Sequence, residues 1–220
     1  MKKAFFFDMD GVLADSETAW EKLGYEDLLK EHFGAELYAK VKIAPGLSIK
    51  RVFDAYASAG WKGEYQSFHE ANMKMALRIY DSIPLTPGLE DLIEQLAAWN
   101  FEIGVVSSSP REWVDVLISR IKNKSKIALI LSVNNHKTLR SKPEPDPYLY
   151  AMKTLEVDPD NTYILEDSIP GVTSGKAAGA TVICLTAYHA QISQELPNNA
   201  DYYASTMKEV QDIVDNICSK

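Results

Sequence analysis

The alternation of short apolar runs with amphipathic stretches is the feature that most constrains the fold of this chain. Five apolar runs have the length of buried strands, at residues 2–7, 102–107, 127–133, 162–165 and 181–185. From Thr86 onward these runs alternate with stretches of helical periodicity. Alternating strands and helices predict a parallel sheet that is covered by helices on both faces. The expected fold class is therefore α/β, with a doubly wound, Rossmann-like parallel sheet as its core.

Three stretches from Thr86 onward carry start signals or apolar stripes of helices. After Thr86-Pro87, apolar side chains at helical spacing form one stripe, made of Leu89, Leu92, Ile93, Leu96 and Trp99. The segment Ser109-Pro110-Arg111-Glu112 is typical of a capping box with proline at the first helical position. Asp146-Pro147 predicts the start of a third helix, with Leu149, Met152 and Leu155 facing inward.

About ninety residues of helical character separate the first expected strand from the second. The other expected strands all follow this helical block. We therefore expect an α-helical cap domain, residues 16–84, inserted into an α/β core made of residues 1–15 and 85–220.

Composition excludes several classes of protein. The formal net charge is −8 and the pI is near 5.1, which argues against a nucleic-acid partner, because phosphate backbones bind basic surfaces. No segment approaches the roughly 18 apolar residues of a membrane span, and the N-terminal apolar run ends at Asp8, too early for a signal peptide. Two cysteines are too few for a disulfide framework. We expect a cytoplasmic monomer without a membrane or nucleic-acid partner.

Polar and charged residues follow the expected strands at their carboxyl ends, where open parallel sheets bind ligands. They are Asp8 and Asp10 after the first strand, Ser107, Ser108 and Ser109 after the second, Lys142 in the loop after the third, and Glu166, Asp167 and Ser168 after the fourth. We expect these groups to converge on one edge of the sheet.

Four carboxylates in one pocket would repel one another unless a cation balanced them. A hard divalent cation with oxygen ligands meets this need, and Mg²⁺ suits one or two carboxylates together with a phosphate. Lys142 adds a positive charge, and the helix starts expected near Ser109 and Ser168 offer backbone N–H groups to an anion. The expected guest is a small phosphorylated metabolite.

These residues form an ordered set of motifs that resembles the haloacid dehalogenase superfamily, in particular its phosphatase and phosphomutase branch with a helical cap. The four motifs are Asp8-Met9-Asp10-Gly11-Val12, Ser107 at the end of its strand, Lys142-Pro143-Glu144-Pro145-Asp146, and Glu166-Asp167-Ser168. A lone pair of aspartates is weak evidence, whereas four motifs in order are a specific signal.

The resemblance implies a role for each residue. Asp8 would be the nucleophile that forms an aspartyl-phosphate, and Asp10 the general acid and base. Ser107, Ser108 and Lys142 would hold the transferring phosphoryl group. Mg²⁺ would be bound by Asp8, the backbone carbonyl of Asp10 and Asp167, with Glu166 binding directly or through water.

Each motif also has a purely structural interpretation, as turn residues for Asp8 and Asp10 or as a surface charge for Lys142. Ser107 would then be a helix cap, and Glu166-Asp167 an acidic pair that suits a helix N-terminus. The occurrence of all four motifs in order favours the catalytic interpretation.

The cap is expected to decide the substrate. β-Phosphoglucomutase-like members of this superfamily carry a histidine a few residues after the first motif and an arginine shortly after a cap glycine. Here Trp20 stands at the first position, where it would line the substrate pocket, and Ile49 stands at the second, after Gly46. Both differences argue against a mutase.

Three functions follow from these observations. The expected one is a magnesium-dependent phosphatase of a small phosphomonoester, such as a sugar, polyol or nucleotide phosphate. A sugar phosphomutase is the alternative, and a non-catalytic phosphate sensor is the third. The pairing of Asp8 with Asp10 argues against a pure sensor, which has no use for an acid and base beside a nucleophile. Halide release is disfavoured because that chemistry needs neither Asp10 nor the magnesium carboxylates.

Overall fold

The structure is a computed structural model that describes residues 2–43, 49–189 and 196–218. The chain forms two compact units. We call residues Met1–Glu17 with Ile83–Lys220 the core unit, and Thr18–Ser82 the helical unit. The helical unit is thus inserted between the first and second strands of the core. The cap domain predicted at residues 16–84 spans this unit, and its role as a cap stays a prediction.

The core unit contains a parallel sheet. Within the described residues six strands pair in the order β3-β2-β1-β4-β5-β6, and every pairing is parallel. The strands are β1 (Lys3–Phe7), β2 (Phe101–Ser107), β3 (Ile127–Ser132), β4 (Thr162–Glu166), β5 (Thr181–Leu185) and β6 (Tyr202–Ala204). The strand order turns at β1, from which the chain extends the sheet in both directions, as in a doubly wound fold.

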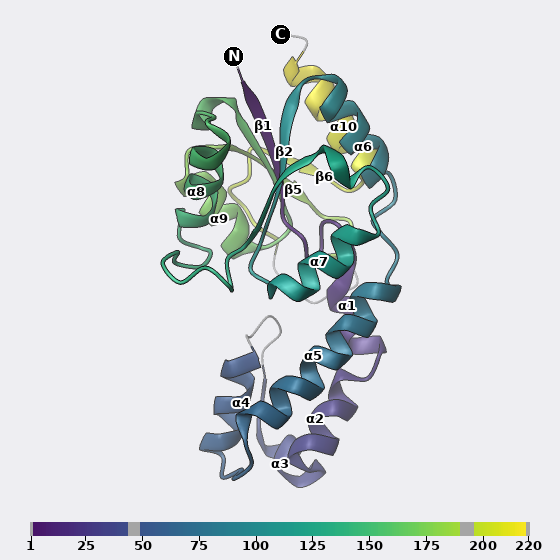
Figure 1. The fold of residues 1–220 in the computed structure, drawn as a ribbon, viewed down its shortest axis with the longest axis vertical. Helices are drawn as coiled ribbons and strands as arrows, with labels where there is room; N and C mark the ends of the chain where they lie inside the picture. Colours follow the sequence, from purple (N-terminus) through teal and green to yellow (C-terminus); the bar gives the residue numbers. More distant parts are fainter. Residues whose placement is uncertain (1, 44–48, 190–195, 219–220) are drawn as a thin grey trace. The chain divides into compact units, whose positions relative to one another are not determined.

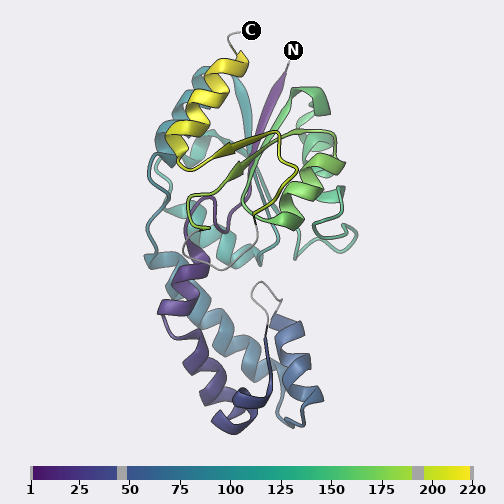
Figure 2. The same ribbon diagram turned by 180° about the vertical axis from the view of Figure 1, so that it is seen from behind.

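Helices cover both faces of this sheet, as Figure 1 shows. On one face lie α8 (Asp146–Leu155) and α9 (Ile169–Ala177), and on the other α6 (Leu89–Ala98) and α10 (Met207–Cys218). Figure 2 shows α6 and α10 side by side, and Gln95 of α6 donates a hydrogen bond of 2.5 Å to Asp215 of α10. The α/β fold class and the parallel sheet that the sequence predicted are therefore confirmed.

The core beneath α8 and α9 explains why one inward residue was predicted wrongly. Tyr148, Ala151, Met152 and Leu155 of α8 are buried in the same apolar cluster as Phe6 of β1. Leu149, which was expected inside, is 45% exposed. The buried side chains stand at i, i+3, i+4 and i+7, so the helix turns Tyr148 rather than Leu149 toward the sheet.

The helical unit has an aromatic core of its own. Its helices are α1 (Ser16–Lys22), whose first two residues belong to the core unit, α2 (Tyr25–Phe33), α3 (Ala35–Lys40), α4 (Ile49–Ser58) and α5 (Tyr65–Ser82). The rings of Phe33 and Tyr56 stack with centroids 3.9 Å apart, and Phe68 packs 4.7 Å from Phe33. Across the described residues, no helix is both long enough and apolar enough to pass through a bilayer.

Candidate active site

Three neighbouring strands end at the candidate site. Phe7, the last residue of β1, pairs with Val105 of β2 on one side and with Leu165 of β4 on the other. This register brings Asp8, Ser107 and Glu166 to one edge of the sheet. Asp8 continues the pairing beyond β1, because its backbone N–H donates to the carbonyl of Leu165 at 2.9 Å. The predicted convergence of the strand ends is therefore present.

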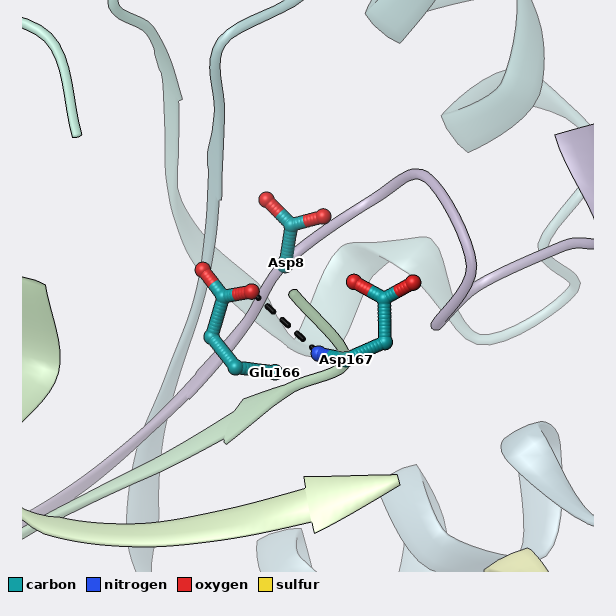
Figure 3. Close-up of side chains that lie close together, drawn as sticks. All are labelled: Asp8, Glu166 and Asp167. Atoms are coloured by element: carbon teal, nitrogen blue, oxygen red, sulfur yellow. Dashed lines mark hydrogen bonds between the residues drawn. The ribbon is translucent and has the colours of Figure 1, made fainter. Parts of the chain in front are cut away.

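A buried acidic cluster lies at this edge. Asp8, Glu166 and Asp167 each offer a carboxylate oxygen within 4.8 Å of the others, and all three residues are buried. In Figure 3 their side chains project to the same side of the chain, and the backbone N–H of Asp167 donates to Oε2 of Glu166 at 3.3 Å. Oxygen ligands grouped in this way are those that Mg²⁺ prefers.

The Lys142 ammonium is bonded to two members of this cluster. It donates to Oδ1 of Asp8 at 2.5 Å, to Oε1 of Glu166 at 2.6 Å and to the carbonyl of Val106 at 3.0 Å. All three of its protons are therefore used. Burial opposes its charge, but the carboxylates of Asp8 and Glu166 outweigh burial and raise the pKa of Lys142 well above its ordinary value. Lys142 is thus a fixed positive charge.

The negative charge of the buried carboxylates is only partly balanced by nearby positive charge. Burial raises the pKa of Asp8 to about 8, although the Lys142 ammonium pulls it down. Burial, together with the neighbouring charges of Asp8 and Glu166, also raises the pKa of Asp167 well above its usual range. One ammonium, bonded to Asp8 and Glu166, does not balance three buried carboxylates, and a divalent cation would supply the missing positive charge. The residues present therefore fit a magnesium ion.

Glu166 is held by more donors than the sequence indicated. Its Oε1 accepts from Lys142 and also from the Tyr148 hydroxyl, each at 2.6 Å. Tyr148 was not predicted as a site residue. The signal that could have found it is the apolar stripe of α8, in which Tyr148 is the one polar-tipped member.

Asp10 is bonded to two serine hydroxyls. Its two carboxylate oxygens accept hydrogen bonds of 2.6 Å, one from Ser16 and one from Ser109. The capping role predicted for Ser109 is wrong. Helix α7 (Arg111–Ser119) has Pro110 at its N-cap position without a side-chain cap, and the Ser109 hydroxyl is directed to Asp10 instead. Ser16 was likewise not expected to contact Asp10.

The helix start predicted near Ser168 is confirmed. Ser168 is the N-cap of α9, and its hydroxyl accepts from the backbone N–H of Gly171 at 3.2 Å. Gly171 itself leaves room for Glu166, since a Cβ there would lie 1.9 Å from Oε2 of that carboxylate. The first turn of α9 therefore lies close to the acidic cluster, and the absence of a side chain at Gly171 leaves space for the Glu166 carboxylate.

The two serines predicted to bind phosphate differ in their surroundings. The Ser107 side chain is fully buried, and its hydroxyl accepts from the backbone N–H of Ser109 at 3.0 Å. Ser108 is exposed. The hydroxyl proton of Ser107 is not used by that bond, so it is free to be donated.

The residues expected to set substrate choice belong to the helical unit. Trp20 lies in α1, and its ring makes a T-shaped contact with the ring of Tyr25, with centroids 5.2 Å apart. Ile49 is the first residue of α4, and Gly46 lies outside the described residues. The role of Trp20 in substrate binding stays a prediction.

Comparison with known proteins places these residues in a family context. A family model described as haloacid dehalogenase-like hydrolase matches residues 5–185. The chain is 29% identical to hexitol phosphatase B of Escherichia coli K12, over 86% of this chain and 85% of that protein. It is 27% identical to the CBBY-like protein of Arabidopsis thaliana, over 91% of this chain and 68% of that protein.

A solved structure has the same fold. The crystal structure of CbbY from Rhodobacter sphaeroides in complex with phosphate superposes with a TM-score of 0.72 over 96% of each chain, at 22% identity. The likeness therefore extends through both units of the chain and not only through the sheet.

Proposed function

The chain belongs to the haloacid dehalogenase-like hydrolase family, as a phosphoric monoester hydrolase, and from that premise we propose that it is a magnesium-dependent phosphatase of a small sugar or polyol phosphate. The single observation that carries the proposal is the Lys142 ammonium fixed 2.5 Å from Asp8 inside a buried acidic cluster. This arrangement supports the proposal, because a carboxylate that could attack phosphorus, a fixed positive charge and carboxylates that could bind a cation lie together at one edge of the sheet.

The metal would be held by residues that the fold already groups. Asp8 and Asp167 would each supply a carboxylate oxygen, and Asp10 its backbone carbonyl. Glu166 would contribute through Oε2, directly or through water, because its other oxygen is bonded to Lys142 and Tyr148. When bound, the metal would neutralise charge on the phosphoryl oxygens.

The chain's own residues divide the chemistry into two steps. Asp8 attacks phosphorus, the bond between phosphorus and the ester oxygen breaks, and Asp10 gives its proton to the departing alkoxide. Water then attacks the aspartyl-phosphate, Asp10 takes up a proton from that water, and Asp8 leaves as a carboxylate with inorganic phosphate as product. Lys142 and the Ser107 hydroxyl hold the phosphoryl oxygens, whose charge must stay balanced through both steps.

The Ser16 and Ser109 hydroxyls both contact Asp10, the proposed general acid and base. Each donates a bond of 2.6 Å to one oxygen of Asp10. Hydrogen bonds to both carboxylate oxygens restrict the orientation of the Asp10 side chain. They therefore hold Asp10 in place for its task as general acid and base.

Support for a sugar or polyol phosphate comes from the relatives. The name hexitol phosphatase B describes a phosphatase of a polyol phosphate, and its alignment covers most of both chains. Trp20 in place of histidine supports hydrolysis over phosphoryl return to the sugar, since an indole donates a hydrogen bond but does not exchange a proton.

A panel of phosphomonoesters tests the proposed function. Purified protein is incubated with Mg²⁺ and hexose, hexitol, pentose or nucleoside monophosphates, and inorganic phosphate is measured. We expect sustained release from at least one sugar or polyol phosphate, and none in EDTA. Release that persists after verified removal of metal would exclude the metal assignment. A coupled dehydrogenase assay on β-glucose 1-phosphate is run beside it, and isomerisation that outpaces hydrolysis would replace the phosphatase with the mutase.

A further inference from the structure

Tyr148 contacts both members of the buried ion pair at the centre of the site. Its hydroxyl donates to Oε1 of Glu166 at 2.6 Å, and the Lys142 ammonium lies 5.0 Å from the centre of its ring. Its side chain is fully buried. No other described residue outside the four motifs donates a side-chain bond to Glu166.

The surroundings of Tyr148 make it a rigid support. It lies in the first turn of α8, which begins four residues after Lys142, and it packs in the apolar cluster under the sheet with Phe6 of β1. The two rings have centroids 6.4 Å apart. The buried ring thus fixes the position from which the Tyr148 hydroxyl donates to Glu166.

The hydroxyl matters because two carboxylates compete for one ammonium. Lys142 is bonded to Asp8 and to Glu166 at nearly equal distances of 2.5 and 2.6 Å. A second donor on Oε1 of Glu166 shares the negative charge of that oxygen and weakens its hold on Lys142. Without the hydroxyl, Oε1 would depend on Lys142 alone and draw the ammonium away from Asp8.

We propose that Tyr148 is a positioning residue of the reaction, which holds Glu166 and thereby keeps the Lys142 ammonium beside the nucleophile Asp8. This inference rests on the proposed function. A purely structural role, in which the hydroxyl needs a partner only because the ring is buried, would affect folding but not turnover. The two roles predict different kinetics.

Steady-state kinetics at saturating Mg²⁺ distinguish them. Tyr148→Phe keeps the ring and removes the hydroxyl, and we expect kcat to fall about tenfold while KM changes by no more than about threefold. The matched control is Tyr150→Phe on the same helix, where the side chain is 37% exposed and the kinetics should not change. A kcat for Tyr148→Phe within about twofold of wild type, measured well below its Tm, would overturn the proposal.

A double-mutant cycle tests whether Tyr148 acts through Glu166. In the Glu166→Gln background, we expect Tyr148→Phe to cost no more than about a further twofold in kcat, since coupled residues are not additive. Losses that multiply would mean that Tyr148 does not act through Glu166, and the proposal would fail.

Binding of inorganic phosphate separates this inference from the proposed function. If wild type hydrolyses no ester, the proposed function fails, and Mg²⁺-dependent phosphate binding by calorimetry then decides the role of Tyr148. We expect Tyr148→Phe to bind phosphate about threefold more weakly and Tyr150→Phe to bind it as wild type does. Equal affinities, or no phosphate binding by wild type, would overturn the inference as well.

Discussion

Single buried charges decide what the site can do. Asp8 has its pKa raised to about 8 by burial, yet it lies against an ammonium that stays charged. Removing Lys142 would leave two buried carboxylates without their positive partner, which costs several kcal/mol in typical proteins. The charge balance of the site therefore depends on four side chains together, those of Asp8, Lys142, Glu166 and Asp167. The effect of replacing one of them depends on the charges of the other three.

The first prediction concerns the proposed nucleophile. Asp8→Asn preserves the size of the side chain but replaces the attacking oxygen with an amide, so phosphate release should fall by about a thousandfold or more. The measurement is phosphate release at saturating Mg²⁺, with circular dichroism to confirm the fold. Asp91→Asn, at an exposed position of α6, is the control that should retain full activity. Retention of a tenth of the wild-type rate by Asp8→Asn would remove Asp8 from its role.

At the scale of elements, the turn after β1 shapes the site. Gly11 has φ of +72°, and the turn is closed by hydrogen bonds from Gly11 N–H to Ala14 and from Leu13 N–H to Met9. A Cβ at Gly11 would lie 1.9 Å from Oδ2 of Asp167, so the absence of a side chain leaves space for that carboxylate. The turn thus positions Asp8 and Asp10 while it accommodates a predicted metal ligand.

The substitution Gly11→Ala should have two separable effects, one on stability and one on Mg²⁺ binding. The positive φ should cost about 1 kcal/mol of unfolding free energy, and displacement of Asp167 should weaken Mg²⁺ binding about tenfold or more. Gly34→Ala is the matched control, because Gly34 also has positive φ, +88°, but a Cβ there would meet nothing within 4 Å. Urea unfolding and Mg²⁺ titration measure the two costs. Equal Mg²⁺ affinity in both variants would contradict the account.

Several elements were predictable because their signals are local. Strands β1 to β5 stand within a residue or two of their predicted ranges, since buried parallel strands are continuous apolar runs. The N-cap at Ser168 was also predictable, because a cap depends on residues three positions apart. Strand β6 was missed because it has only three residues, two of them exposed tyrosines, and therefore carries no apolar run.

The partners of Asp10 were not predictable, because they depend on contacts made by the folded chain. Ser109 has the sequence context of a helix cap, but its hydroxyl bonds to a residue 99 positions away. A serine hydroxyl can donate to a local backbone group or to a distant carboxylate. The local sequence does not show which distant groups the folded chain brings within reach. The residues of the four motifs were predictable as a group because they follow parallel strands, whose carboxyl ends meet at one edge of the sheet, and because the ordered motifs resemble a known family.

At the scale of the whole molecule, burial of the acidic cluster couples stability to pH and metal. Burial raises the pKa of Asp8 from 3.8 to about 8, so the folded state holds this proton more tightly than the unfolded state does. That contribution to stability is fully present below about pH 4 and is lost as the pH rises through about 8. Mg²⁺ binds the ionised carboxylates, and its stabilising effect should therefore grow over the same range.

Thermal melts with and without Mg²⁺ at about pH 6 and about pH 8.5 check this prediction. We expect the metal-free Tm to fall as the pH rises and the increase caused by Mg²⁺ to be larger at the higher pH. The Tm of the Asp8→Asn protein should depend less on pH and less on Mg²⁺ than that of wild type. An increase in Tm that is the same at the two pH values would contradict the coupling.

Substrate choice is predicted to depend on the helical unit. Trp20→Ala should raise KM about threefold or more for the preferred ester while kcat stays within about twofold, because Trp20 supplies apolar surface and no reacting atom. Trp99→Ala, at a 40% exposed position after α6 in the core unit, is the control. An equal loss of kcat for every ester, with the fold intact, would mean that Trp20 acts on the chemical step.

Trapping of the phosphorylated protein identifies the residue that attacks phosphorus. Wild type is mixed with its preferred phosphomonoester and Mg²⁺, quenched in acid within the first turnovers, and digested for mass spectrometry. We expect one added phosphoryl group, located on Asp8, and none in the Asp8→Asn protein. Phosphate release with the phosphoryl group on another residue, or with no phosphorylated protein at any quench time, would contradict this expectation.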